Sequence, residues 1–391
     1  CLPTALSLQP APSRVLLVSF DGFRWDYIYK VPTPNFHRAM ENGVHVKQVT
    51  NVFLTVTYPN HYTLVTGLYA ESHGIVANEM YDPILNETFS MSTMDIYNSK
   101  FWEEATPIWI TNQREGHKTG AAMWPGTDVK IHGVFPTHYM PYNESVSFED
   151  RVARLIDWFT SEEPINFGLL YWEQPDEMGH ILGPENPLMG PIIGDVDKKL
   201  GYLMSELKKA KLWDEVNVIV TSDHGMLQCS SERLIELDRY VSRELYTIIE
   251  HSPAVSILPK EETRNKQIKN CGWEMPIYLV ALFGKAPEGF CSLCSRRVEK
   301  GVGSACLFCS FRILTFICLL LLVGNHGYDN TVPEMHPIFL AFGPAFRRNA
   351  TKEAMNSTDL YPLLCHLLGI NALPNNGSFN AVKDLLVEEV P

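Results

Sequence analysis

Three short apolar runs, each followed closely by acidic residues, constrain the fold of this chain more than any other feature. The runs cover residues 15–20, 167–172 and 216–220. Uninterrupted apolar runs of this length are typical of strands that are buried on both faces of a parallel sheet. Binding sites in such sheets lie beyond the carboxyl ends of the strands. We therefore expect the polar residues that follow the three runs to meet at one edge of a sheet.

Apolar residues at helical spacing alternate with these predicted strands. The stripes cover residues 152–159, 196–207 and 360–368, and the first of them follows a capping sequence at 147–150. Helices that alternate with buried strands produce a doubly wound sheet that is covered on both faces. We predict an α/β protein with a mostly parallel central sheet. A chain of 391 residues can bury one large core, so we expect a single domain over residues 14–391.

Seven residues that can bind a metal or act as a nucleophile lie beyond predicted strands or in comparable turns. They are Asp21, Thr57, Asp176, His180, Asp223, His224 and His326. Three carboxylates, three imidazoles and a hydroxyl suit two zinc ions better than magnesium, which prefers a shell of oxygen atoms. An alternative interpretation makes Thr57 only the N-cap of a helix that starts near Pro59. A helix N-terminus there would also favour a phosphate anion.

In this order and context, the seven residues resemble the motifs of the ectonucleotide pyrophosphatase/phosphodiesterase family. The resemblance covers about residues 14–259 and 324–391. It implies an alkaline-phosphatase-like fold with helices on both faces of the sheet. It also implies two zinc sites: one formed by Asp176, His180 and His326, the other by Asp21, Asp223 and His224 with the Thr57 oxygen as a further ligand.

The resemblance also implies roles for residues around the metal ligands. Thr57 would be the nucleophile that forms a covalent nucleotidyl-threonine, and Asn78 would stabilise the phosphoryl oxygens. Tyr58 and Tyr142 would stack on the nucleotide base, although an aromatic residue in these contexts is more often part of the core. The family usually has Lys immediately before the nucleophile, where this chain has Val56. We expect this difference to weaken the binding of highly charged substrates more than the binding of NAD.

The activity that the resemblance implies is hydrolysis of pyrophosphate or phosphodiester bonds in nucleotides. The substrate implied first is NAD, cleaved to AMP and nicotinamide mononucleotide. Diadenosine polyphosphates or other nucleotide phosphodiesters are the alternative. A sulfatase is disfavoured, because the chain has Thr57 and no Cys/Ser-x-Pro-x-Arg motif. His61 and His73 lie near Thr57 in the sequence and are predicted to be structural.

Charge and sequons indicate the partners and the compartment. The net charge of −13 disfavours a nucleic-acid polymer as ligand and is compatible with a small nucleotide bound through metal ions. Residues 1–13 are expected to be the end of a signal peptide and a linker. We expect a monomeric extracellular or cell-surface protein, without the C-terminal membrane anchor of related members. Five Asn-x-Ser/Thr sequons favour the secretory pathway, at Asn86, Asn143, Asn349, Asn356 and Asn376.

Residues 261–323 differ from the rest of the chain. They contain six of the nine Cys, and eight Lys or Arg against five Glu, which gives a charge of +3 against −16 for the remainder. Two Cys-x-x-Cys pairs, at 291–294 and 306–309, are compatible with a zinc ribbon. The mostly apolar run 305–323 is long enough for a membrane span, but a span would separate His326 from Asp176. A third interpretation is translated non-coding sequence or an alternative exon, and in that case the chain could be a catalytically impaired glycoprotein.

Two cysteines outside this segment and the signal remnant are Cys229 and Cys365. An oxidising compartment would permit a disulfide between them, and the sequence leaves open whether the fold brings their sulfur atoms within bonding distance.

We predict that the chain as written is secreted poorly and aggregates or is retained, because a secreted loop with such an apolar run exposes a large apolar patch. Replacement of residues 261–323 by the corresponding segment of an ordinary family member should restore soluble, active, two-zinc protein. Secreted yield, zinc content and activity of the two chains test this. Efficient secretion of the unmodified chain with full zinc and activity would contradict it.

Overall fold

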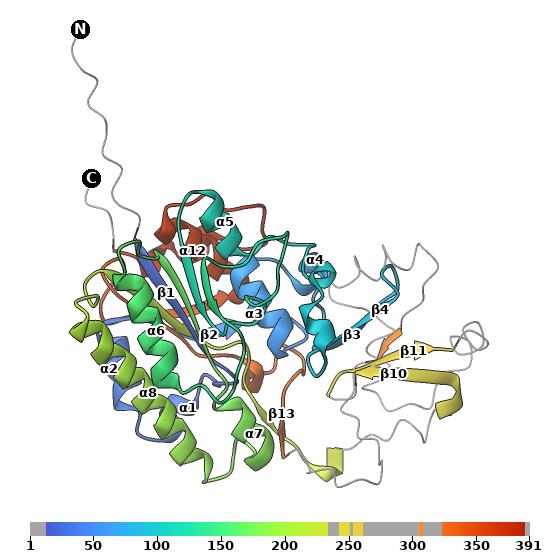
Figure 1. Ribbon diagram of the computed structural model, residues 1–391. Helices are drawn as coiled ribbons and strands as arrows, with labels where there is room; N and C mark the ends of the chain where they lie inside the picture. The colour runs from blue at the N-terminus through green and yellow to red at the C-terminus, as the bar shows by residue number, and fades with distance from the viewer. Residues whose placement is uncertain (1–12, 234–241, 251–252, 261–304, 308–322, 388–391) are drawn as a thin grey trace.

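The computed structural model describes residues 13–233, 242–250, 253–260, 305–307 and 323–387 (Figure 1). Within these ranges the largest sheet has eight strands in the order β15-β2-β14-β8-β1-β7-β5-β6. From edge to edge the strands are β15 (Ala350–Asn356), β2 (Gly43–Thr50), β14 (Phe339–Phe342), β8 (Val216–Thr221), β1 (Arg14–Phe20), β7 (Phe167–Trp172), β5 (Thr119–Ala122) and β6 (His138–Met140).

Seven strands of this sheet run in one direction, and β14 runs against them. β1 pairs in parallel with β7 and β8, β5 pairs in parallel with β6 and β7, and β15 pairs in parallel with β2. β14 is antiparallel to both of its neighbours, β2 and β8. The predicted mostly parallel α/β sheet is confirmed, and the three apolar runs are its central strands.

Helices cover both faces of the sheet because alternate strand residues point to opposite sides. In β1, Val15 and Leu17 belong to one apolar cluster, and Leu16 and Val18 to the other. The first cluster includes residues of α3 (Thr57–Thr66), α5 (Ile108–Arg114) and α12 (Leu360–Leu368). The second includes residues of α1 (Tyr27–Lys30), α2 (Pro34–Glu41), α6 (Phe148–Thr160) and α8 (Met189–Lys209). These two clusters form the core.

The three predicted apolar stripes are the buried faces of α6, α8 and α12. The Ser147 hydroxyl accepts a hydrogen bond from the Asp150 N–H at 3.1 Å, which caps α6 as the sequence predicts. The chain before α12 is capped by side chains as well. Asn356 and Asp359 make a capping box around a 3₁₀ turn, η8 (Ser357–Asp359), which leads into α12.

Smaller elements lie at the carboxyl edge of the sheet and beside it. They are α4 (Ala70–His73), α7 (Asp176–Leu182), the hairpin β3 (Glu79–Asp82) and β4 (Glu87–Ser90), the pair β9 (Leu227–Gln228) and β13 (Gly324–Asn325), and the three-stranded sheet of β10 (Tyr246–Glu250), β11 (Val255–Pro259) and β12 (Ala305–Leu307). The predicted ribbon at 291–309 and the apolar run at 305–323 lie outside the described residues, apart from β12 and Val323. Among the described helices, none is long and apolar enough to cross a membrane.

The disulfide between Cys229 and Cys365 that the sequence left open is not formed. Cys365 is buried on α12 within the first apolar cluster. The Sγ atom of Cys229 lies beside the hydroxyl of Tyr328, at 3.9 Å. The fold therefore places the two thiols beside separate neighbours.

His73, at the end of α4, is a neutral core residue. Its ring is fully buried, and the Ile75 N–H donates to Nδ1 at 3.2 Å. Nε2 therefore carries the proton and donates to the Pro59 carbonyl at 3.2 Å, with the Thr63 hydroxyl at 3.0 Å. Burial lowers the pKa of His73 to about 3. The structure thus keeps His73 as part of the core packing.

This buried histidine predicts a loss of stability in acid. The unfolded chain binds a proton at His73 below its usual pKa of about 6.5, whereas the folded chain does so only near 3. Between about pH 7.5 and pH 5, the free energy of unfolding should therefore fall by about 2 kcal/mol more in the wild type than in His73→Gln. Thermal or urea unfolding across this range measures the difference, with the exposed His366→Gln as control. Equal pH dependence of wild type and His73→Gln would contradict the assignment.

Candidate metal centre

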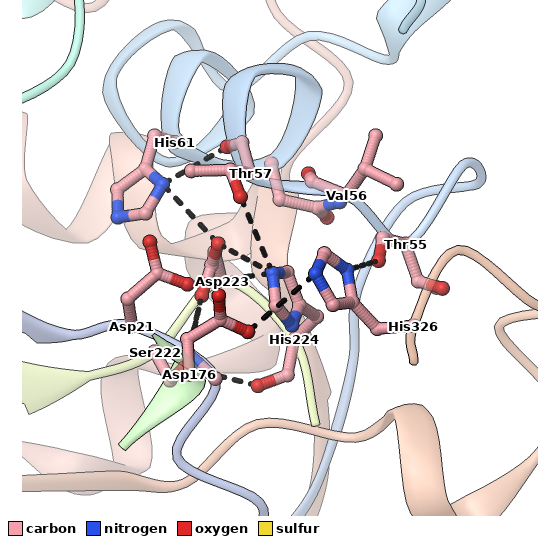
Figure 2. Close-up of polar contacts among 12 residues, drawn as sticks. Asp21, Thr55, Val56, Thr57, His61, Asp176, Ser222, Asp223, His224 and His326 are labelled. Carbon is pink, nitrogen blue, oxygen red and sulfur yellow. Dashed lines mark hydrogen bonds and ion pairs between the residues drawn. The ribbon is translucent and has the colours of Figure 1, made fainter. Parts of the chain in front are cut away.

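Three carboxylates, two of them buried and that of Asp176 half-buried, meet at the carboxyl edge of the sheet (Figure 2). Asp21 follows β1, Asp176 begins α7 after β7, and Asp223 follows β8. The Asp176 N–H donates to the Asp21 carbonyl at 3.0 Å, which ties two of these turns together. Gly22 has φ +65°, and a Cβ atom there would lie 2.7 Å from Asp176 Oδ1, so only glycine permits this approach.

Each carboxylate keeps at least one oxygen for a ligand. The Tyr171 hydroxyl donates to Asp21 Oδ2 at 2.5 Å, and Asp223 Oδ1 accepts from the Gly22 N–H at 3.1 Å and from the Ser222 hydroxyl at 3.0 Å. Asp21 Oδ1, Asp176 Oδ1 and Asp223 Oδ2 are buried and accept no hydrogen bond within the described part of the chain. Buried carboxylate oxygens without a donor are costly, and a bound cation compensates them.

Three imidazoles face these oxygens with their Nε2 atoms. The Nδ1–H groups of His180, His224 and His326 donate to the carbonyls of Gly324, Gly225 and Thr55, at 3.0, 2.8 and 2.9 Å. In the neutral ring each Nε2 atom is then left for a ligand, and the Nε2 atoms of His180 and His326 lie only 3.1 Å apart. Metal-bound histidines in proteins are oriented by such outer hydrogen bonds.

The Nε2 atoms and the carboxylates are close enough to share ions. His224 Nε2 lies 3.0 Å from Asp223 Oδ2 and 3.4 Å from Asp21 Oδ1. Nε2 of His180 lies 3.3 Å from Asp176 Oδ2, and Nε2 of His326 lies 3.5 Å from Asp176 Oδ1. These six residues therefore fit a centre of more than one cation, with mixed nitrogen and oxygen ligands.

The electrostatics of the centre also favour bound cations. Burial, and after it the charges of Asp223 and Asp176, raise the pKa of Asp21 well above its usual value. Burial acts in the same direction on Asp223, but His224 and His61 outweigh it and hold the pKa of that carboxyl well below its usual value. Burial and the nearby His224 lower the pKa of His326 to about 3, which keeps this ring neutral as a metal ligand must be.

His61, predicted to be structural, lies beside the ligands but has no lone pair to offer. Its Nδ1–H donates to the Thr57 carbonyl at 2.9 Å, and Nε2 accepts from the Ser19 hydroxyl at 2.8 Å. By proximity alone it groups with Asp21 and Asp223, and His224 groups with Asp176 and His326. Because both ring nitrogens of His61 are occupied, His224 suits the Asp21 and Asp223 site better.

Thr57 lies at the N-terminus of α3, with its hydroxyl toward the ligands (Figure 2). Its Oγ1 is 3.5 Å from His224 Nε2. Val56 is the N-cap of α3, so the interpretation of Thr57 as the cap is wrong. The Val56 side chain is buried and points away from the carboxylates.

Asn78 is held beside Thr57 by the backbone of α3. Its Oδ1 accepts a hydrogen bond from the Tyr58 N–H at 2.9 Å, and the residue is buried. This bond fixes the orientation of the amide, because only the carbonyl oxygen can accept. The Nδ2 group is then the end of the side chain that can donate to a bound anion.

Tyr58 and Tyr142 belong to a group of aromatic residues near an acidic residue, Asp128. The Tyr58 ring packs edge-on against Trp102 at 6.0 Å, and Tyr142 is 46% exposed. Burial, followed by the proximity of Asp128, Tyr97 and Tyr142, raises the pKa of Tyr58. The structure therefore brings the two predicted tyrosines into one region.

Sequence reasoning missed four residues of this region. Tyr171 and Ser222 orient the carboxylates, and Asp128 and Tyr97 lie beside Tyr58. Asp128 follows β5, so the rule that sites lie beyond the carboxyl ends of parallel strands would have found it. Tyr171 lies within an apolar strand, where its hydroxyl gives no spacing signal.

The five predicted sequon asparagines are all exposed.

Comparison with known proteins identifies the class that this fold and site define. The family described as type I phosphodiesterase / nucleotide pyrophosphatase matches residues 15–271. The chain belongs to this family of metal-dependent phosphodiesterases, and specifically to its ectonucleotide pyrophosphatase/phosphodiesterase members. The family predicted from the sequence is thereby confirmed.

Two curated relatives and two solved structures show the extent of the similarity. The chain is 64% identical to human ectonucleotide pyrophosphatase/phosphodiesterase family member 5, over 100% of this chain and 81% of that protein. It is 45% identical to the bis(5'-adenosyl)-triphosphatase enpp4 of Xenopus laevis, over 96% of this chain and 82% of that protein. The structure of an inactive threonine-to-alanine variant of the murine member 5, in complex with AMP, matches with a TM-score of 0.86 and 62% identity, over 96% of this chain and 100% of that one. The human member 5 structure matches with a TM-score of 0.85 over the same shares.

Proposed function

We propose that this chain is an extracellular, zinc-dependent nucleotide pyrophosphatase that cleaves NAD to AMP and nicotinamide mononucleotide. The observation that carries the proposal is a set of buried carboxylate oxygens that, among the described residues, accept no hydrogen bond and face the Nε2 atoms of three imidazoles beside Thr57. Mixed nitrogen and oxygen ligands suit zinc, whereas magnesium and calcium prefer oxygen alone.

The contacts among the six ligand residues support two zinc sites. The first would be held by Asp176, His180 and His326, and the second by Asp21, Asp223 and His224 with the Thr57 oxygen. When bound, two such ions lower the pKa of a hydroxyl nucleophile and neutralise charge on the phosphoryl oxygens.

Residues of the chain would then bind and orient the reacting groups. Oγ1 of Thr57 would lose its proton to solvent and form a bond to phosphorus while the bond from phosphorus to the bridging oxygen breaks, and the leaving phosphate takes the electron pair. Water would next cleave the nucleotidyl-threonine and return a proton to Thr57. The N-terminus of α3 favours the phosphate anion, and Nδ2 of Asn78 would donate to one of its oxygens.

The substrate is proposed from the aromatic region and the relatives. Tyr58 and Tyr142 would hold the adenine base, and the murine relative with AMP bound supports an adenine nucleotide product. The relative named bis(5'-adenosyl)-triphosphatase favours diadenosine polyphosphates as the alternative. A comparison of kcat/KM for NAD and for diadenosine triphosphate decides between them.

Localisation and organisation are part of the same proposal. Exposure of all five sequon asparagines supports glycosylation and an extracellular or cell-surface location. We propose one catalytic domain over residues 14–391, acting as a monomer on a small nucleotide. The competing function is a catalytically impaired cell-surface glycoprotein. Zinc analysis of the purified chain, with an assay on a chromogenic nucleotide ester, separates the two functions. About two zinc ions per chain together with turnover would support the enzyme. Absence of both zinc and turnover would support the glycoprotein.

The nucleophile assignment predicts the effect of changing Thr57. Thr57→Ala should lower kcat by at least about a thousandfold, while zinc stays bound by the Asp and His ligands. Thr57→Ser should retain measurable turnover because it keeps a hydroxyl. The murine relative that is inactive as a threonine-to-alanine variant supports this expectation. Thr66→Ala, at the other end of α3, is the control, and near-normal activity of Thr57→Ala would rule out the assignment.

The division into two zinc sites predicts two classes of variants. His180→Ala and His326→Ala should each lose the same ion and retain about one zinc per chain. Asp21→Asn and Asp223→Asn should instead deplete the site beside Thr57, because they remove its carboxylate charge. Zinc content and residual activity of all four variants check this. Identical stoichiometry and identical activity in the four would leave the division without support.

A further inference from the structure

Thr55 holds the loop that carries His326 with both its side chain and its backbone. Its hydroxyl accepts a hydrogen bond from the Gly327 N–H at 2.9 Å and donates to the Tyr328 carbonyl at 2.8 Å. Its carbonyl accepts from Nδ1–H of His326 at 2.9 Å, as Figure 2 shows. Thr55 is fully buried, so water does not compete for these bonds. One residue therefore fixes three consecutive residues of this loop.

The loop that contains Thr55 is itself fixed to α3. The Asn60 side chain donates to the carbonyls of Leu54 and Val56, at 2.8 and 2.9 Å. Its oxygen accepts from the Val52 N–H at 2.9 Å. The three bonds hold residues 52–56 against the first turn of the helix that begins at Thr57. Thr55 is therefore rigidly related to the hydroxyl of Thr57.

A second asparagine connects the same loop to the carboxylates. Nδ2 of Asn51 donates to the Asp223 carbonyl at 3.1 Å, and the Asn51 carbonyl accepts from Asn330 at 2.7 Å. Asn51 is buried at the end of β2. The loop 51–56 thus contacts the turn after β8 on one side and the chain around His326 on the other.

The two loops also approach closely at Gly327. This residue has φ +106°, and a Cβ atom there would lie 3.0 Å from Val56 Cγ1. A larger residue would separate the loops and stretch the bonds to Thr55. The contact therefore permits little movement of His326 relative to α3.

We propose that Thr55 is a positioning residue that sets the Asp176, His180 and His326 metal site at a fixed distance from Thr57. The proposal rests on the proposed function. The carbonyl of Thr55 selects the tautomer of His326 that exposes Nε2, and its hydroxyl holds the backbone on which His326 sits. Outer hydrogen bonds of this kind, when removed, typically lower metal affinity about tenfold to a hundredfold.

Two pairs of variants isolate the hydroxyl of Thr55. The wild type and Thr55→Val have side chains of the same shape, and only the wild type has the hydroxyl. Thr55→Ser and Thr55→Ala both lack the threonine methyl group, and of these two only Thr55→Ser has a hydroxyl. We expect Thr55→Val and Thr55→Ala to bind one of two zinc ions about tenfold to a hundredfold more weakly, with the other ion unchanged. Competition with a chelating dye measures both affinities. Thr55→Ser should restore the wild-type affinity.

A control distinguishes positioning from general stabilisation. Thr66→Val removes another buried hydroxyl, which donates to the Tyr62 carbonyl at 2.7 Å within α3, away from the ligands. It should lower the melting temperature without changing either zinc affinity. At saturating zinc, Thr55→Val should recover much of its kcat, which a merely structural defect would not allow.

The outcomes separate this proposal from the proposed function. Wild type without two zinc ions would overturn both. Wild type with two ions, together with unchanged affinities in Thr55→Val and Thr55→Ala, would overturn only the role of Thr55. The role of Thr55 would also be overturned if Thr66→Val weakened the binding of one zinc ion as much as Thr55→Val does. If Thr55→Val and Thr55→Ala do not fold while Thr55→Ser does, the hydroxyl supports the fold instead of the site, and the proposal is wrong.

Discussion

Repulsion among the closely spaced carboxylates of Asp21, Asp176 and Asp223 is the constraint on which the rest of the site depends. Two like unit charges 4 Å apart repel by about 4 kcal/mol at an effective dielectric constant near 20. Tyr171, Ser222 and the Gly22 N–H stabilise part of this charge, but three oxygens accept no bond in the described structure. The Nε2 atoms of His180, His224 and His326 face the same space, because their Nδ1–H groups donate to backbone carbonyls. Bound cations would relieve the repulsion among the carboxylates, so we expect metal binding and folding to be linked.

The topology of the sheet explains how residues from distant parts of the sequence reach this point. β1, β7 and β8 run in parallel, so the residues after them meet at one edge of the sheet. β2 runs in the same direction, and the loop before Thr57 therefore begins at the same edge. β14 runs the other way, and therefore it begins where the others end. The chain that enters it, which contains His326, is at the site for this reason. One reversed strand thus completes the ligand set.

The central strands and the positions of the carboxylates were predictable, because strands buried on both faces leave uninterrupted apolar runs in the sequence. The direction of β14 was not, since a run of four buried residues reads the same in either direction. The contacts of Tyr171, Ser222 and Thr55 were also not predictable, because hydroxyls inside strands and loops follow no periodic pattern. Whether Cys229 pairs with Cys365 was not predictable either, because an oxidising compartment permits a disulfide without placing its two sulfur atoms together.

The burial of α3 has a consequence for how this protein would lose activity. All of its residues except Tyr58 are buried, and its polar side chains at Asn60, Thr63 and Thr66 are bonded inside the core. A helix in this position opens only when the whole domain unfolds, unlike the peripheral loops that carry many active sites. Amide protons of α3 would then be among the slowest in the chain to exchange with solvent. Heat inactivation would coincide with global melting, because the helix that carries Thr57 does not unfold separately from the core.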